Sequence, residues 1–341
     1  MMGLENLTRY LQEAAMKKMI IRADDIGFSP ANDLGAFEAI EKGVVTAADV
    51  MLDCPNSANA LERLREMPWI SVGWHTHMWG SPVSDSAGVP SLILHEGPFS
   101  GRFRPDLKQA QDVVFEEILQ ELRAQIDRCV RILGHAPSTG GAIRSTATPY
   151  WRAFRQVCDE YGIALNIARR EPQNPEVWEE IESAQKRGEE WAQYYKKPLE
   201  EELPDPKWAD RKIVIADASV AYRALNSDSV VDWEANYDPI RYYTEDQGKL
   251  LRYDDETVVE QSWHPGYVDY FVYRLGEWMG RPRARHFTLC RPEDVHALCS
   301  EELKQWIREK GIVLINYRDA LYGTNEYQNH LRVTGSDLYM L

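Results

Sequence analysis

The sequence predicts an α/β fold, a TIM-barrel-like (β/α) barrel of about seven or eight parallel strands with a helical insertion. Short apolar, β-branched segments alternate with segments of helical periodicity along most of the 341 residues. Alternation of this kind is typical of parallel βαβ units. No repeat, low-complexity tract or Gly/Ser-rich linker interrupts it, so we expect a single domain over residues 1–341.

The first units show the pattern most clearly. Strands are expected at 19–23, 44–52 and 69–74, and the first two lead into helices at 32–42 and 56–66. The longest helical pattern runs from 107 to 133 and ends at Gly134, a residue that commonly stops helices. Further segments complete the alternation: a helix at 150–161, strands at 163–167, 212–216 and 258–263, and a helix at 301–310 before a strand at 312–317.

One stretch interrupts this rhythm. Residues 169–211 are dense in Glu, Lys, Trp and Tyr and poor in β-branched residues. A long segment of this kind inside a compact domain is usually functional. We expect a helical insertion over one barrel end, as a lid or as a subunit contact in a homodimer.

Composition limits the partners and the compartment. The chain has 39 basic and 54 acidic residues and a formal charge of -15, which repels phosphate backbones and anionic lipids, so no nucleic-acid or membrane partner is expected. The five cysteines are widely spaced and form no CxxC pair, which favours a reducing, cytoplasmic setting. Residues 1–18 have apolar residues at helical spacing without a basic start, so they are expected to form an amphipathic helix and not a signal peptide.

Asp24 and Asp25 follow the first predicted strand directly. Successive side chains of a strand point to opposite faces, so both can serve one site only where the strand breaks into a loop. Each is then able to take a separate role, one as a metal ligand and the other as a general base. The alternative is a structural role, in which one Asp caps the helix or turn that follows.

Three histidines also stand at predicted strand ends. His75 and His77 are two residues apart and, with the period of a strand, project to the same face, which suits metal binding. A polar strand face without metal is the alternative for this pair. His264 follows the strand at 258–263 and precedes a Pro-Gly turn, and its ordinary pKa suits it to proton transfer.

Aromatic residues lie close to these motifs. Trp79 and Trp263 are candidates for stacking on a sugar ring, although large aromatic side chains are more often part of the core. Tyr267, which follows the same Pro-Gly turn, is a third substrate-binding candidate.

The motifs together resemble those of the YdjC-like carbohydrate deacetylases, the family that includes the chitooligosaccharide deacetylases and the hopanoid-biosynthesis deacetylase. Residues 21–29 (IRADDIGFS) resemble the family's N-A-D-D-F-G-x-S, and the resemblance extends over most of the chain. Four shorter motifs follow in the family's order: residues 43–46 (GVVT), 72–75 (VGWH), 97–99 (GPF) and 263–267 (WHPGY).

The resemblance implies hydrolysis of an N-acetyl group on an amino sugar or small oligosaccharide, assisted by a divalent metal, with Zn or Mg expected. Carried over by position, Asp25 and His75 hold the metal, Asp24 is the general base and His264 protonates the leaving amine. The predicted partner is therefore a small carbohydrate.

One family feature is missing. Family members carry a segment of the form P-T-H-x-D-x-H after the long helix, and its last histidine completes the metal site, whereas residues 137–146 here contain neither His nor Asp. Three interpretations follow. His77 replaces the lost ligand, which is the prediction we adopt; or Arg144 supplies a fixed positive charge in a metal-free site; or the barrel binds carbohydrate without catalysis.

Overall fold

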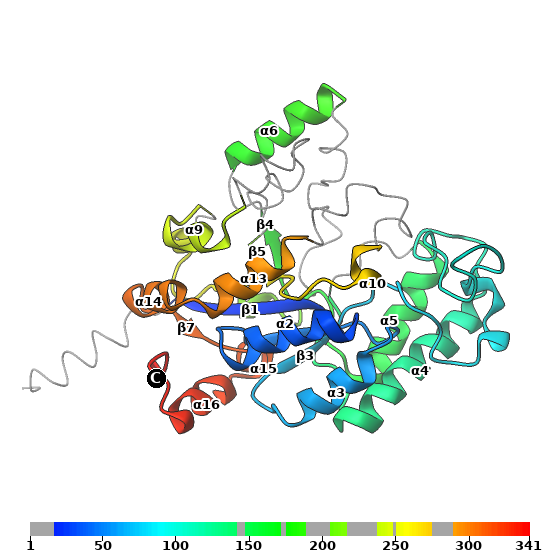
Figure 1. The fold of residues 1–341 in the computed structure, drawn as a ribbon, viewed down its shortest axis with the longest axis horizontal. Helices are drawn as coiled ribbons and strands as arrows, with labels where there is room; N and C mark the ends of the chain where they lie inside the picture. The colour runs from blue at the N-terminus through cyan, green and yellow to red at the C-terminus, as the bar shows by residue number, and fades with distance from the viewer. Residues whose placement is uncertain are drawn as a thin grey trace, which may run out of the picture.

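The protein has a parallel β-sheet surrounded by helices (Figure 1). The computed structural model describes residues 17–141, 147–171, 175–188, 205–216, 237–247, 250–274 and 289–341. Within these ranges the strands are β1 (Lys18–Ile26), β2 (Ala47–Val50), β3 (Ser71–Trp74), β4 (Arg169–Glu171), β5 (Ile213–Ala216), β6 (Val258–Trp263) and β7 (Val313–Leu314). The predicted parallel α/β architecture is confirmed.

Helices follow most of the strands. Those of the first half are α2 (Pro30–Glu41), α3 (Ser57–Arg65), α4 (Phe115–Leu133), α5 (Pro149–Tyr161) and α6 (Pro175–Lys186). Those of the second half are α9 (Pro239–Thr244), α10 (Tyr270–Tyr273), α13 (Arg291–Cys299), α14 (Glu301–Glu309), α15 (Tyr317–Tyr322) and α16 (Glu326–Thr334). In Figure 1, α2, α3, α4, α13 and α14 lie around the strands, and α6 stands apart at the top.

The strand order makes the sheet barrel-like. The order is β3-β2-β1-β6-β5-β4, and β7 pairs with the start of β1. Single parallel bridges continue from Gly73 of β3 to Thr139 and from Thr139 to Ala164, which lies shortly before β4 in the chain. The bridges extend the sheet beyond β3 toward the segment that leads into β4. Because the strands are parallel, the carboxyl ends of β1, β2, β3 and β6 lie at one end, where barrel enzymes carry their sites.

Three predicted elements were wrong in part. The strand expected at 312–317 covers only Val313–Leu314, and Tyr317 begins α15. Residues 163–167 form only the bridge at Ala164, because left-handed conformations at Gly162 (φ 69°) and Asn166 (φ 48°) interrupt an extended strand. The long helix begins at Phe115 and not at 107. Leu107, Ala110 and Val113 are buried at helical spacing from turns before the helix, and their apolar pattern does not distinguish a turn from a helix.

Other predictions fall partly outside the described residues. The helix expected at 1–18 lies almost entirely outside them. Of the insertion at 169–211, β4 and α6 are described but 172–174 and 189–204 are not, so its role as a lid or as a homodimer contact stays a prediction.

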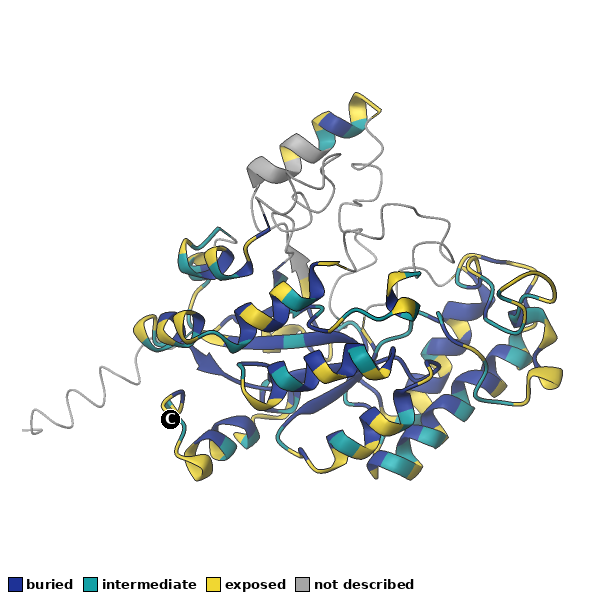
Figure 2. Ribbon diagram, in the orientation of Figure 1, coloured by how far each residue is buried: buried dark blue, intermediate teal, exposed yellow. Residues whose placement is uncertain are grey.

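The core lies between the strands and the inner faces of the helices (Figure 2). Every residue of β2 and β3 is buried, and α4 turns a stripe of residues that includes Ile118, Leu122 and Ile126 toward the same core. This periodicity is that of a helix with one apolar face. No helix in the described ranges is both long enough and apolar enough to cross a bilayer.

Candidate metal centre

The end of β1 is shaped so that two adjacent carboxylates both belong to the site. The pairing register of β1 with β2 shifts between Ala23 and Ile26, and Asp25 adopts a left-handed backbone with φ 62°. The irregularity breaks the alternation of an ideal strand. Asp24 and Asp25 are both buried, so neither is a solvated surface acid.

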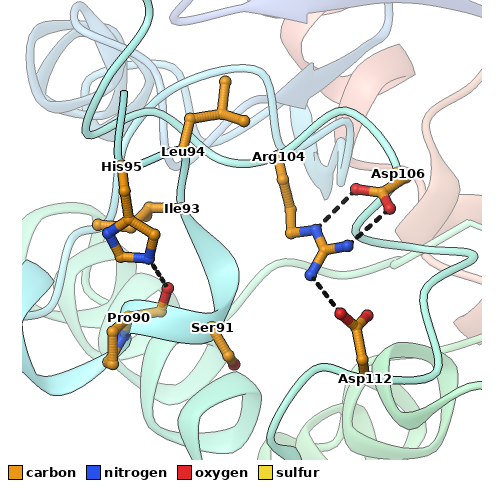
Figure 3. A pocket seen from close by; sticks show the side chains of 8 residues that line it. All are labelled: Pro90, Ser91, Ile93, Leu94, His95, Arg104, Asp106 and Asp112. Carbon is orange, nitrogen blue, oxygen red and sulfur yellow. Dashed lines mark hydrogen bonds and ion pairs between the residues drawn. The ribbon is translucent and has the colours of Figure 1, made fainter. Parts of the chain in front are cut away.

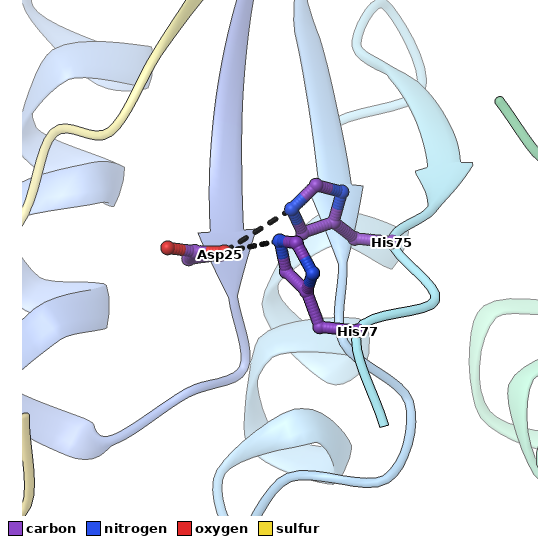
Figure 4. Close-up of side chains that lie close together, drawn as sticks. All are labelled: Asp25, His75 and His77. Atoms are coloured by element: carbon purple, nitrogen blue, oxygen red, sulfur yellow. Dashed lines mark ion pairs between the residues drawn. The ribbon is translucent and has the colours of Figure 1, made fainter. Parts of the chain in front are cut away.

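Asp25 meets both histidines of the loop after β3 (Figure 4). Its Oδ1 lies 3.1 Å from His75 Nε2 and 3.6 Å from His77 Nε2. The three potential ligand atoms all lie within 4.8 Å of one another. The structure thus brings together the three residues predicted as metal ligands.

The route to this arrangement differs from a simple strand alternation. β3 ends at Trp74, so His75 and His77 belong to the following loop. The His75 amide still donates to Val50 O at 2.9 Å and continues the β2 pairing, whereas the His77 amide donates to His75 O at 3.1 Å. The chain therefore starts to turn between the two histidines, and their rings meet at 4.1 Å, nearly perpendicular at 82°.

The donor set suits a divalent ion. Asp25 Oδ1 and His75 Nε2 are buried and neither has a hydrogen-bond partner, although they lie 3.1 Å apart. Unsatisfied buried polar atoms are rare in proteins, and a bound cation would give both of these atoms a partner. Burial lowers the pKa of His77 well below its ordinary value, so the ring is neutral at neutral pH with a lone pair available. One carboxylate and two imidazoles match the ligands of catalytic zinc sites.

The second oxygen of Asp25 is held by a buried arginine that the sequence did not reveal. Arg291, in the first turn of α13, donates from Nη2 to Asp25 Oδ2 and from Nη1 to Asn32 Oδ1, the latter at 3.0 Å. Asn32 in turn donates to the Asp25 carbonyl at 3.0 Å. Burial raises the pKa of Asp25, but Arg291, His75 and His264 together outweigh it and hold the pKa well below its usual range. Asp25 is therefore ionised, and Oδ1 is the oxygen that faces the histidines.

Asp24 belongs to a cluster of charged side chains around Arg22. Arg22, two residues earlier on β1, donates from Nε to Asp24 Oδ1 at 2.5 Å and from Nη2 to Asp24 Oδ2 at 3.0 Å. The same guanidinium contacts three further groups: Asp49 of β2 at 3.5 Å, Glu260 of β6 at 2.6 Å and the Tyr317 hydroxyl at 3.1 Å. Asp24, Asp49 and His75 also converge closely enough to ligate an ion, but Arg22 already places a positive charge between the two carboxylates.

His264 stands beside Asp24 and is held through its backbone. Its Nε2 lies 3.8 Å from Asp24 Oδ2, and its amide donates to Asp294 Oδ2 at 2.9 Å. The other oxygen of Asp294 accepts the Tyr237 hydroxyl. Burial lowers the pKa of His264 to about 4, so the imidazole is neutral at neutral pH. Helix α13 therefore supports both ends of the site, Asp25 through Arg291 and His264 through Asp294.

The remaining predicted residues have different surroundings. Trp263 is 2% exposed and donates from Nε1 to the Tyr243 hydroxyl at 2.6 Å, so it packs in the core and does not face a ligand. Tyr267 is 37% exposed and donates to Glu38 on α2 at 2.6 Å. Trp79 stacks on His77. Arg144 lies outside the described residues.

A separate hollow of about 430 Å³ lies among residues 90–112 (Figure 3). Its charged lining is already paired, because Arg104 contacts Asp106 at 2.7 Å and Asp112 at 3.2 Å. None of the predicted site residues lines it. It therefore offers no continuation of the metal centre.

The fold and the arrangement of Asp24, Asp25, His75 and His264 define a class, that of barrel-like α/β proteins with a carboxylate and histidine centre at the strand ends. A model of the family described as YdjC-like protein matches residues 18–309. The chain belongs to the YdjC-like family, which confirms the resemblance drawn from the motifs.

Several relatives have carbohydrate deacetylase names. Carbohydrate deacetylase 2 of Listeria innocua is 24% identical over 306 residues, which cover 89% of this chain and 98% of that protein. A carbohydrate deacetylase of Listeria monocytogenes serotype 4a is 33% identical, with 89% and 99% covered. The chitooligosaccharide deacetylase of Serratia marcescens is 28% identical, with 47% of this chain and 63% of that protein covered.

One solved structure supports the fold. A crystal structure from Enterococcus faecalis V583, of a protein provisionally named a cellobiose-phosphate cleavage protein, matches with a TM-score of 0.55 at 20% identity. The match covers 89% of this chain and 99% of that one. At this identity the likeness extends to the fold alone.

Proposed function

We propose that this protein is a metal-dependent hydrolase that removes the N-acetyl group from an amino sugar or small oligosaccharide. The convergence of Asp25, His75 and His77 within 4.8 Å is the observation that carries the proposal. Membership of a family whose relatives are named carbohydrate and chitooligosaccharide deacetylases supports the substrate class.

The ligand types favour some ions over others. Two imidazoles and one carboxylate suit zinc, cobalt or manganese better than magnesium, which prefers oxygen ligands and water. Asp25, His75 and His77 would hold the ion, which when bound would polarise the acetyl carbonyl and acidify a water molecule. His77 takes the place of the family histidine that is missing from residues 137–146.

Asp24 and His264 are the proposed proton-transfer pair. The neutral imidazole of His264 must gain a proton before it can protonate the leaving amine. Asp24 is placed to supply this proton, because its Oδ2 lies 3.8 Å from His264 Nε2. Asp24 takes the proton of the attacking water and passes it to His264, and the imidazolium then delivers it to the amine nitrogen as the C–N bond breaks. Water and amide are thereby converted to acetate and a free amine.

The test combines metal analysis with product analysis. Protein prepared without chelator is loaded with zinc, cobalt or manganese and given N-acetylglucosamine and its short oligomers, and released acetate is measured. We expect one ion per chain and acetate release by the wild type. Asp25→Ala and His77→Ala should lose both, whereas His135→Ala, at an exposed histidine, should lose neither.

Two results would contradict the proposal in different ways. If the protein binds no stoichiometric ion and releases no acetate, the proposal that it is a hydrolase is wrong. If the protein binds these sugars but releases no acetate with any of the three metals, it is a non-catalytic carbohydrate-binding barrel.

A further inference from the structure

The ring of His77 lies flat against the indole of Trp79. The two centroids are 3.9 Å apart and the planes differ by 3°. Met78, between them, has a left-handed backbone with φ 60°. On an extended strand, residues two apart are separated by roughly 6 to 7 Å, so this turn at Met78 is what allows the two rings to stack.

Trp79 is itself held from several sides. Its ring packs against Phe28 at 5.9 Å, and Phe28 packs against Phe271 at 5.1 Å. Its carbonyl accepts a hydrogen bond from Arg102. Phe28 and Arg102 come from segments far apart in the chain, and their contacts restrict where the indole can lie.

The residue after Trp79 anchors the loop to the barrel. The Gly80 amide donates to Asp53 Oδ2 at 2.6 Å, and the Gly80 carbonyl accepts the Phe103 amide at 3.2 Å. A Cβ at position 80 would lie 2.0 Å from the Asp53 carbonyl oxygen. Only glycine allows this close approach.

We propose that Trp79 is a positioning residue that fixes the His77 imidazole with Nε2 toward Asp25, so that the loop after β3 supplies two of the three metal ligands. The proposal rests on the proposed function, because it assumes that His77 is a ligand. Since one face of the indole is covered by His77, stacking on a sugar is left at most to the other face.

The physical reason is preorganisation. His77 Nε2 is 3.6 Å from Asp25 Oδ1 without a direct hydrogen bond, so contact with the carboxylate does not fix the ring. The stack restricts the side-chain torsions of His77 and leaves Nε2 at the edge that faces Asp25. Loss of groups that orient metal ligands typically weakens metal affinity by about 10- to 100-fold.

The chain offers a matched control for the test. Trp69 stacks on His330 with centroids 3.8 Å apart and planes 7° apart, and neither residue belongs to the metal centre. Trp69→Leu therefore removes a Trp–His stack of the same geometry. Trp79→Leu removes the stack on His77, Trp79→Phe keeps a smaller aromatic surface, and His77→Ala removes the ligand.

The measurement is cobalt binding followed by the visible absorption of the bound ion, with the histidine ring resonances of the metal-free protein recorded by NMR. We expect Trp79→Leu to weaken cobalt binding about tenfold or more, with Trp79→Phe between it and the wild type and Trp69→Leu unchanged. The His77 ring protons, shifted by the indole in the wild type, should lose that shift in Trp79→Leu.

The failures are distinguishable. If His77→Ala loses cobalt while Trp79→Leu binds it as tightly as the wild type, the positioning role is overturned and the metal centre stands. If the wild type takes no cobalt, the proposed function falls, and the role of the stack in ligand positioning falls with it. Equal weakening in Trp69→Leu and Trp79→Leu would make the effect one of general stability and would also overturn the role.

Discussion

Arg22 donates two hydrogen bonds to the carboxylate of Asp24, from Nε to Oδ1 at 2.5 Å and from Nη2 to Oδ2 at 3.0 Å. The motif that residues 21–29 resemble has asparagine at the position of Arg22. Here a largely buried positive charge lies close to three carboxylates, those of Asp24, Asp49 and Glu260. Asp24 is thereby kept ionised and fixed in orientation, because Arg22 lowers its pKa against the opposing effect of burial.

Replacement of Arg22 should strongly destabilise the fold. Arg22→Asn leaves buried carboxylates without their counter-charge, and breaking one partner of a buried ion pair typically costs about 3 to 5 kcal/mol. Arg22→Lys keeps the charge but loses the two-pronged geometry, so a smaller loss is expected. The measurement is the free energy of unfolding in urea at pH 7.

A surface pair of similar geometry is the control for Arg22. Arg123 also makes two contacts to one carboxylate, that of Glu160, at 2.8 and 2.7 Å, but on the exposed face of α4. Arg123→Ala should cost about 1 kcal/mol or less. A loss in Arg22→Asn no larger than that in Arg123→Ala would show that the interior charges do not depend on Arg22.

Removal of the Asp294 side chain should impair turnover and spare metal binding. Asp294 accepts the His264 amide, and His264 is the proposed acid. Asp294→Ala frees this backbone, and a displaced catalytic group typically costs about 10²-fold in rate. Acetate release at saturating substrate and cobalt affinity are measured side by side, with Asp254→Ala, at a surface turn, as the control. If Asp294→Ala loses cobalt affinity to the same extent as turnover, Asp294 helps to position the metal ligands and not His264.

The sequence placed the strand-end residues together because parallel strands bring their carboxyl ends to one edge of the sheet, independently of how the helices pack. Asp24, Asp25, His75 and His264 could be found in this way. Arg291 could not, since it approaches Asp25 only through the packing of α13 on α2. Asn32 could not, since it lies on α2 and contacts the Asp25 carbonyl through its side chain, which no strand-end pattern indicates. Trp263 was a candidate for substrate binding but is buried, because the sequence alone does not distinguish a tryptophan that faces a ligand from one that packs in the core.

The pH dependence of stability should reveal the buried carboxyl of Asp53. Burial raises its pKa to about 6 from an ordinary value of 3.8. The folded state therefore binds a proton more tightly than the unfolded state does. This contribution to stability is complete below about pH 4 and is lost as the pH rises through about 6.

Asp53→Asn isolates this contribution. The amide oxygen can still accept the Gly80 amide, and the side chain no longer ionises. The difference in unfolding free energy, wild type minus variant, should fall between pH 4 and pH 7 by up to about 3 kcal/mol, which corresponds to two pKa units. Urea unfolding of both proteins across this range measures it. A difference independent of pH would mean that Asp53 has an ordinary pKa in the folded protein.

Gly80→Ala should disturb the metal centre without touching a ligand. The new Cβ would lie 2.0 Å from the Asp53 carbonyl oxygen, which is backbone and cannot move aside as a flexible side chain can. The loop must shift, and His77 and Trp79 shift with it, so cobalt affinity should fall about tenfold or more. Gly88→Ala is the control, because its Cβ would meet only the end of the Gln120 side chain, which can rotate away. Retained cobalt affinity in Gly80→Ala, with the fold intact by circular dichroism, would show that the anchor at Asp53 does not determine the position of His77.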